Sequence, residues 1–241
     1  MNKAIMKSLV PEGHLRAAIN VGNFLLVPHI NADGTPTGPS PDIAMRIAQE
    51  LDVECELICF ERPGLIADTV DSGRWDICNI AEEPARAEVM DFTISYALID
   101  AHFLIHKDSK LRQSQDVDQV ETTIAVPDRA AYDLWLTANL RHATIKRTSS
   151  MTEALELFRK GAATVLAGLK PALIEEVASN PNYIILHPMF TAIRQAVGIK
   201  KGNPEVLAFL NTVIANMIST GFIEDSLRRH GVHSKLSIPI S

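Results

Sequence analysis

The amino-acid sequence predicts an α/β protein of two lobes, each a mostly parallel sheet flanked by helices, joined by a two-strand hinge. Two series of short apolar strands and amphipathic helices support this prediction. One series precedes Tyr96, and the other lies between two extended apolar runs, near Tyr96 and near Val197. The chain therefore leaves the first lobe once and returns to it once. We expect lobe one to comprise residues 1–97 and 198–241, and lobe two residues 98–197.

In lobe one, strands alternate with helices that begin at proline. Ser40 can cap and Pro41 can begin a helix, because apolar residues follow it at helical spacing. Gly73 is expected to close the next helix. The predicted elements are a strand from Leu15 to Gly22-Asn23, a loop over residues 29–39, a helix from Pro41 to Leu51, a strand over residues 53–60, a helix over residues 63–72 and a strand over residues 75–80.

Lobe two repeats this alternation after a polar surface loop. Ser150 and Glu153 have the spacing of a capping box at a helix start. The predicted strands are 122–126, 143–147, 163–167 and 183–186, and the predicted helices are 130–140, 151–159 and 171–179. Two further helices, 203–219 and 222–230, are expected to return to lobe one.

Composition excludes several classes of protein. The chain has 241 residues, is 46% hydrophobic and carries a net charge of −6 without a basic run, so a nucleic-acid surface is not expected. No segment reaches the roughly 18 apolar residues of a membrane span, so no membrane insertion is expected. Residues 1–16 lack the apolar block of a secretory signal, so either a signal was removed or the protein stays in the cytoplasm.

Cysteine and histidine positions suggest neither a disulfide framework nor a metal. Cys55, Cys59 and Cys78 are an odd count in predicted strands, so we expect buried thiols. His102 and His106 are four apart, which suits a metal on a helix but not on the strand expected here.

The stretch from Asp76 to Phe92 is the candidate binding element. A short strand ends there in a polar turn and a proline-initiated helical turn that carries Arg86, a combination typical of anion sites at the carboxyl edge of α/β sheets. The alternative is that Arg86 only forms an exposed ion pair with Glu82 or Glu83.

Three strings of residues resemble a known family. They are Asp76-Ile77 with Arg86 and Asp91-Phe92-Thr93 before Tyr96; Pro41-Asp42-Ile43-Ala44 with Ile47-Ala48; and Gly221-Phe222 with Ile223. Together with the order of elements, they resemble the family 3 bacterial solute-binding proteins, receptors of amino-acid ABC transporters with a type II periplasmic-binding-protein fold.

The resemblance implies a function. Two lobes would close on a small carboxylate, and Arg86 would clasp the carboxylate with two parallel hydrogen bonds. It also implies contacts from Asn23 and Phe24, a possible ABC permease as partner, a periplasmic location, a monomer and no cofactor.

The sequence departs from the family at three places. Ala81 stands where a serine or threonine is usual, Arg129-Ala130 replaces a glycine and a hydroxyl residue, and Gly168-Leu169-Lys170 lacks the usual acid for the ligand ammonium. We therefore expect a carboxylate that lacks an α-ammonium or pairs it with Glu82, with any second anionic group near Lys170 or Arg129. The expected ligand-binding residues are Arg86, Asn23, Phe24, Ala81, Glu82, Arg129, Ala130, Ala131, Tyr132, Gly168 and Lys170.

Two alternative functions stay open. A cyclohexadienyl-dehydratase-like enzyme would use the same fold but needs a general acid. Glu82, Glu83 and Asp128 are the available acids, and each is more simply a solvated loop charge. A cytoplasmic ligand-sensing protein is the other alternative.

Overall fold

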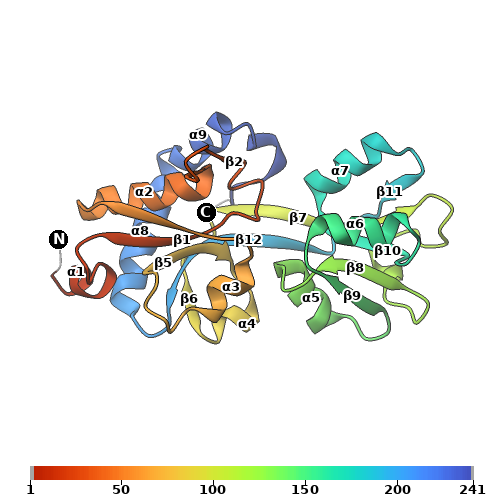
Figure 1. Ribbon diagram of the computed structural model, residues 1–241, viewed down its shortest axis with the longest axis horizontal. Coiled ribbons are helices and arrows are strands. Elements are labelled where there is room, and N and C mark those ends of the chain that lie inside the picture. Colours follow the sequence, from red (N-terminus) through yellow and green to blue (C-terminus); the bar gives the residue numbers. More distant parts are fainter. Residues whose placement is uncertain (1–2, 240–241) are drawn as a thin grey trace. The chain divides into compact units, whose positions relative to one another are not determined.

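The computed structural model describes residues 3–239 and divides the chain into two compact units (Figure 1). Unit 1 contains the chain up to Leu98 and from Arg194 onward, and unit 2 contains Ile99–Ile193. The chain passes from one unit to the other within two long strands, β7 (Ala97–His106) and β12 (Thr191–Lys200). The predicted domain limits and the hinge motion stay predictions.

Unit 1 is built on a mostly parallel sheet. Its strands run in the order β4-β1-β5-β12, and β6 pairs with the far part of β12. β4 and β5 both pair with β1 in parallel, whereas β12 is antiparallel to β5. The bounds are β1 Leu15–Asn20, β4 Cys55–Phe60, β5 Ile77–Ala81 and β6 Met90–Phe92.

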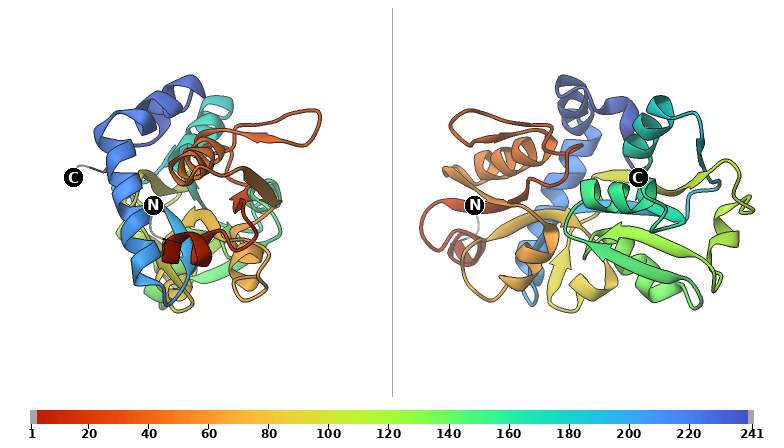
Figure 2. Two further views of the ribbon diagram at one scale, coloured as in Figure 1. Left: turned by 90° about the vertical axis from the view of Figure 1, so that its left-hand side faces the viewer. Right: turned by 45° about the vertical axis from the view of Figure 1, so that its right-hand side comes forward.

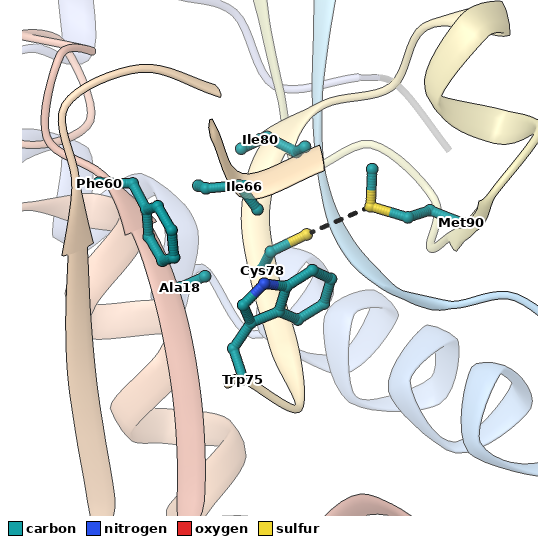
Figure 3. Close-up of a cluster of buried hydrophobic side chains, with 7 residues drawn as sticks. All are labelled: Ala18, Phe60, Ile66, Trp75, Cys78, Ile80 and Met90. Carbon is teal, nitrogen blue, oxygen red and sulfur yellow. Dashed lines mark hydrogen bonds between the residues drawn. The ribbon is translucent and has the colours of Figure 1, made fainter. Parts of the chain in front are cut away.

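Helices cover both faces of this sheet, as the nearly continuous apolar strands require. α3 packs on one face, and its Ile66 joins a buried cluster with Ala18, Trp75 and Cys78 (Figure 3). On the other face, Asn79 donates a hydrogen bond to the Ser40 carbonyl of α2 (2.7 Å). The helices are α1 Lys3–Leu9, α2 Pro39–Leu51, α3 Pro63–Asp68, α4 Pro84–Ala87, α8 Pro204–Ser219 and α9 Phe222–Arg229.

Unit 2 has a second sheet of the same kind. Its strands run in the order β7-β10-β8-β9, with β11 paired to β7. β10, β8 and β9 are parallel, and β7 is antiparallel to both β10 and β11. The bounds are β8 Thr123–Pro127, β9 Thr144–Thr148, β10 Val165–Leu169 and β11 Tyr183–Ile185.

Buried side chains pack on both faces of this sheet, because neighbouring residues of β7 point to opposite sides. Leu104 and Leu166 pack with Phe158 and Leu173 of α6 and α7. Phe103, the neighbour of Leu104 on β7, instead stacks on Phe190, which also contacts Trp135 of α5. The bounds are α5 Ala131–Asn139, α6 Met151–Arg159 and α7 Lys170–Ser179. The predicted fold class is confirmed.

Two local expectations are wrong. α2 begins at Pro39, two residues earlier than predicted, and Gly38 rather than Ser40 is its N-cap. Gly38 has φ 151°, and a Cβ there would lie 2.3 Å from the Leu26 carbonyl oxygen, so no larger residue fits. Cys59 is exposed and Cys55 only partly buried, because β4 lies at the edge of the unit 1 sheet; Cys78 is buried as expected.

Some short elements were not predicted. The loop after β1 contains a hairpin of β2 (His29–Ile30) and β3 (Pro36–Thr37), which projects beside α2 in Figure 2. The polar loop of unit 2 contains a 3-10 helix over Ser114–Val117, and another, His233–Lys235, follows α9. α3 also ends at Asp68, earlier than predicted.

Candidate functional site

The carboxyl ends of β1, β4 and β5 meet at one edge of the unit 1 sheet, because these strands are parallel. A Cβ at Gly22, after β1, would lie 2.4 Å from the carbonyl oxygen of Glu61, after β4. The loops that follow the strands are therefore in close contact. Glu82 and Glu83 follow β5 at the same edge and lead into α4.

Arg86 is buried in this edge. Its side chain belongs to the four-residue helix α4, which has proline in its first positions, and the residue is only 4% exposed. The guanidinium Nη1 donates a hydrogen bond to the Ala81 carbonyl oxygen (2.7 Å), which orients the group against the end of β5. The alternative of an exposed ion pair for Arg86 is wrong, because its guanidinium is inside the protein.

Glu83 is also buried, with 8% of its surface exposed, so its interpretation as a solvated loop charge is wrong. Within residues 3–239, its carboxylate oxygens are not among the fully buried side-chain atoms that lack a hydrogen-bond partner. Burial raises the pKa of Glu83 to about 7, while Arg86 opposes this increase and Glu82 adds to it. Ionising a carboxylate that has lost much of its water costs free energy, so this group favours a proton or a cationic partner.

Glu82, the acid expected to receive a ligand ammonium, is 41% exposed in its side chain. Its carboxylate lies 3.3 Å from Arg194 Nε, and its backbone N–H donates to the Arg194 carbonyl. Glu82 thus already has a cationic partner within unit 1.

The other expected contacts of unit 1 lie at the same edge. Asn23 accepts a hydrogen bond from the Leu25 backbone N–H (3.2 Å), which stabilises the turn after β1. Phe24 is 41% exposed, as a contact residue needs to be. Ala81 is buried and contributes its carbonyl to Arg86.

Gln195 is a polar residue beside the end of β5 that the sequence did not indicate as part of the site. It lies opposite Ala81 in the β5–β12 ladder and is buried, although it is polar. The signal was present, since Gln195 interrupts the apolar residues of a predicted strand at a position that faces inward.

In unit 2, the loop before α5 and the first turn of α5 carry four of the expected residues. Arg129 adopts a left-handed backbone (φ 58°), which is unfavourable for a residue with a side chain. The buried Asp133 carboxylate stabilises it by accepting a hydrogen bond from the Arg129 backbone N–H (2.7 Å). Ala130 is the N-cap of α5, and Ala131 and Tyr132 are buried in its first turn. Burial raises the pKa of Tyr132, which keeps this phenol protonated.

Gly168 and Lys170 lie at the end of β10. Gly168 is packed so closely that a Cβ would lie 2.9 Å from side-chain atoms of Leu173 and Met151. Lys170 is partly exposed, and its Nζ lies 3.7 Å from an oxygen of Asp100. This acidic neighbour of Lys170 was not anticipated.

The histidine pair lies on a strand, as predicted. His102 is buried and its Nδ1 lies 2.9 Å from the Leu186 carbonyl oxygen, whereas His106 is at the strand end beside Asp108. No three His, Cys, Asp or Glu side chains between residues 3 and 239 are grouped as metal ligands. Over the same residues, no single helix is long and apolar enough to cross a membrane; only the bent pair α8 and α9, at 66°, meets those criteria together.

The chain is similar to proteins that bind amino acids. The model of the family "Bacterial extracellular solute-binding proteins, family 3" matches residues 23–233. The L-cystine-binding protein TcyJ of Escherichia coli (strain K12) is 23% identical over 80% of this chain and 73% of its own length.

Solved structures share the fold. The solute receptor for L-cysteine of Neisseria gonorrhoeae has a TM-score of 0.75 at 21% identity, covering 94% of this chain and 92% of that one. An ancestral amino-acid-binding protein, AncCDT-1, described as a precursor of cyclohexadienyl dehydratase, has a TM-score of 0.74 at 22% identity over 93% of this chain and 98% of that one. At these identities the structures establish the fold alone, and the type II periplasmic-binding-protein fold expected from the sequence is confirmed.

Proposed function

Because this chain belongs to the bacterial extracellular solute-binding proteins, family 3, we propose that it is a receptor for a small amino-acid-like carboxylate, which it delivers to an ABC permease. Members of this family work outside the cytoplasm, and we place this protein in the periplasm. The relatives bind cystine and cysteine, so amino acids are the first ligands to test.

One observation carries this proposal: Arg86 is buried at the carboxyl edge of the unit 1 sheet and held there by the Ala81 carbonyl. A guanidinium presents five N–H donors in a plane and matches a carboxylate with two parallel hydrogen bonds. Burial strengthens such a contact, because water competes less for both charges. We assign Arg86 as the carboxylate anchor, with Asn23, Phe24 and the backbone at Ala81 beside it.

The residues of unit 2 are proposed as secondary contacts. The first-turn N–H groups of α5, near Arg129, Ala130, Ala131 and Tyr132, favour negative charge. Lys170, beside Gly168, adds a cation, but Asp100 already offsets part of its charge.

Isothermal titration with L-cystine, L-cysteine, L-arginine and L-lysine tests this function. We expect saturable binding of at least one of these acids by the wild-type protein and its loss in Arg86→Met. A thermal-shift assay gives a second readout, since ligand at about 100 times its Kd adds about 2.7 kcal/mol of stability. Binding that is unchanged in Arg86→Met would remove Arg86 from the site.

We propose that the protein binds its ligand without catalysing a reaction. One observation favours an enzyme as the second candidate. The buried Glu83, with its pKa raised to about 7, has the properties of a general acid. The similarity to AncCDT-1 points to the same alternative. Incubation with prephenate should release no phenylpyruvate; release that is lost in Glu83→Gln would establish a dehydratase instead.

A further inference from the structure

Glu83 is the buried acidic group that the proposed function does not use. It lies three residues before Arg86 at the N-cap of α4, so that one helical turn holds both a buried carboxylate and a buried guanidinium. Oppositely charged groups this close on one edge match a ligand that carries both charges within a few atoms.

The surroundings of the two neighbouring acids, Glu82 and Glu83, favour Glu83. Glu83 is largely buried and close enough to Arg86 for the two charges to interact, whereas its neighbour Glu82 is near Arg194 and more exposed. A largely buried carboxylate gains more from a new cation than an exposed one, because burial has removed much of its hydration. Glu82 would gain less, since a ligand ammonium would compete there with water and with Arg194.

We propose that Glu83 receives the α-ammonium group of the ligand, and that Arg86 and Glu83 together select α-amino acids over simple carboxylates. This inference rests on the proposed function, because it assigns the second charge of the same site. It replaces Glu82, which we expected from the sequence to fill this role.

Matched pairs of ligands test the inference without changing the protein. Each pair differs only by the α-amino group: L-arginine and 5-guanidinopentanoate, L-cysteine and 3-mercaptopropionate, L-lysine and 6-aminohexanoate. By isothermal titration at pH 8, the wild-type protein should bind the amino acid of at least one pair about tenfold or more tighter than its partner, since a charge-assisted contact is lost. Equal affinity within every pair that binds would overturn the inference.

Two variants assign the preference to one residue. Glu83→Gln should weaken the amino acid about tenfold or more but leave the des-amino acid within about threefold. Glu88→Gln removes the same charge from an exposed position at the end of α4 and should leave both affinities within about threefold.

The failures of the two proposals can be told apart. If Arg86→Met loses binding while Glu83→Gln retains the preference for the amino acid, the assignment of Glu83 is wrong and the carboxylate receptor stands. If none of the six acids binds saturably to the wild-type protein, both proposals are wrong.

Discussion

The ends of β5 and β10 have the same local structure but differ in how deeply their charged residues are buried. Each is the buried end of a central strand and leads to a helix with proline in its first turn. After β5, Arg86 and Glu83 are both buried, whereas after β10 Lys170 is partly exposed and lies near Asp100. Buried charges have lost their water and depend on a partner, but exposed charges do not. The β5 end should therefore dominate recognition, and the β10 end should adjust it.

The largest expected effect is the loss of Arg86. Arg86→Met should weaken binding of an α-amino acid by at least about 100-fold, since it leaves the ligand carboxylate without a cation in a desolvated site. Titration calorimetry measures this change. Arg228→Met, on the exposed side of α9, is the matched control and should bind as the wild type does. A loss of less than about fivefold in Arg86→Met would mean that the β5 end contributes no more to ligand affinity than the β10 end.

The second effect is a pH dependence at the β5 end. Burial raises the pKa of Glu83 to about 7, against the opposing charge of Arg86 and with help from Glu82. An α-ammonium needs the ionised carboxylate, so amino-acid affinity should fall about tenfold between pH 8 and pH 6. The des-amino partner should not weaken over this range. A flat profile for the amino acid would contradict the role given to Glu83.

The third prediction concerns stability rather than binding. The pKa of Glu83 is raised in the folded protein, so ionisation of this carboxylate destabilises the fold. The cost is greatest at pH values above about 7 and is absent below the pKa of the unfolded chain, where the group is protonated in both states. Glu83→Gln should therefore raise the Tm of the ligand-free protein at pH 8, by about 2–4 °C for each kcal/mol gained. The gain should shrink at pH 5, and Glu88→Gln should show no gain at either pH. A lower Tm at pH 8 would show that Glu83 has a structural partner.

The fourth prediction tests the loop before α5. Asp133→Ala should destabilise the protein by about 1–3 kcal/mol, because the Arg129 N–H and the Arg147 guanidinium lose a buried acceptor. Urea unfolding measures the difference. Asp128→Ala, whose carboxylate lies 3.8 Å from the same Arg147 and is exposed, should cost less than about 1 kcal/mol. Equal losses would mean that Asp133 does not hold this loop.

The smallest effect is expected at the β10 end. Lys170→Met should change the affinity for an α-amino acid by less than about fivefold, because the ammonium is partly hydrated and has Asp100 nearby. Lys160→Met, on the exposed end of α6, is the matched control. A large loss in Lys170→Met alone would move the main anion contact to unit 2.

The sequence predicted the fold well because apolar periodicity is a local signal. The limits of α6 agreed with its expected range, and Ser150 caps it as predicted, with its hydroxyl accepting from the Glu153 N–H (3.2 Å). Cys59 was misjudged because sheet order, which places β4 at an edge, is set by contacts far apart in the chain.

The site was predicted less completely. Arg86 stood out because a cation follows a buried strand, and the alternative of a surface pair was excluded only by its burial. Glu83 looked like any loop acid, since nothing in a string of charged residues tells which side chain turns inward. Gln195 reaches the end of β5 from a strand more than 100 positions later, so its place depends on the ladder pairing alone.

The most direct test compares the two strand ends with one ligand. A single α-amino acid that binds the wild-type protein is titrated by calorimetry at pH 8 into Arg86→Met and into Lys170→Met. We predict that the loss of affinity in Arg86→Met exceeds the loss in Lys170→Met by about 20-fold or more, as expected for a buried against an exposed charge. Losses of equal size, or a larger loss in Lys170→Met, would contradict the assignment of the ligand carboxylate to the end of β5.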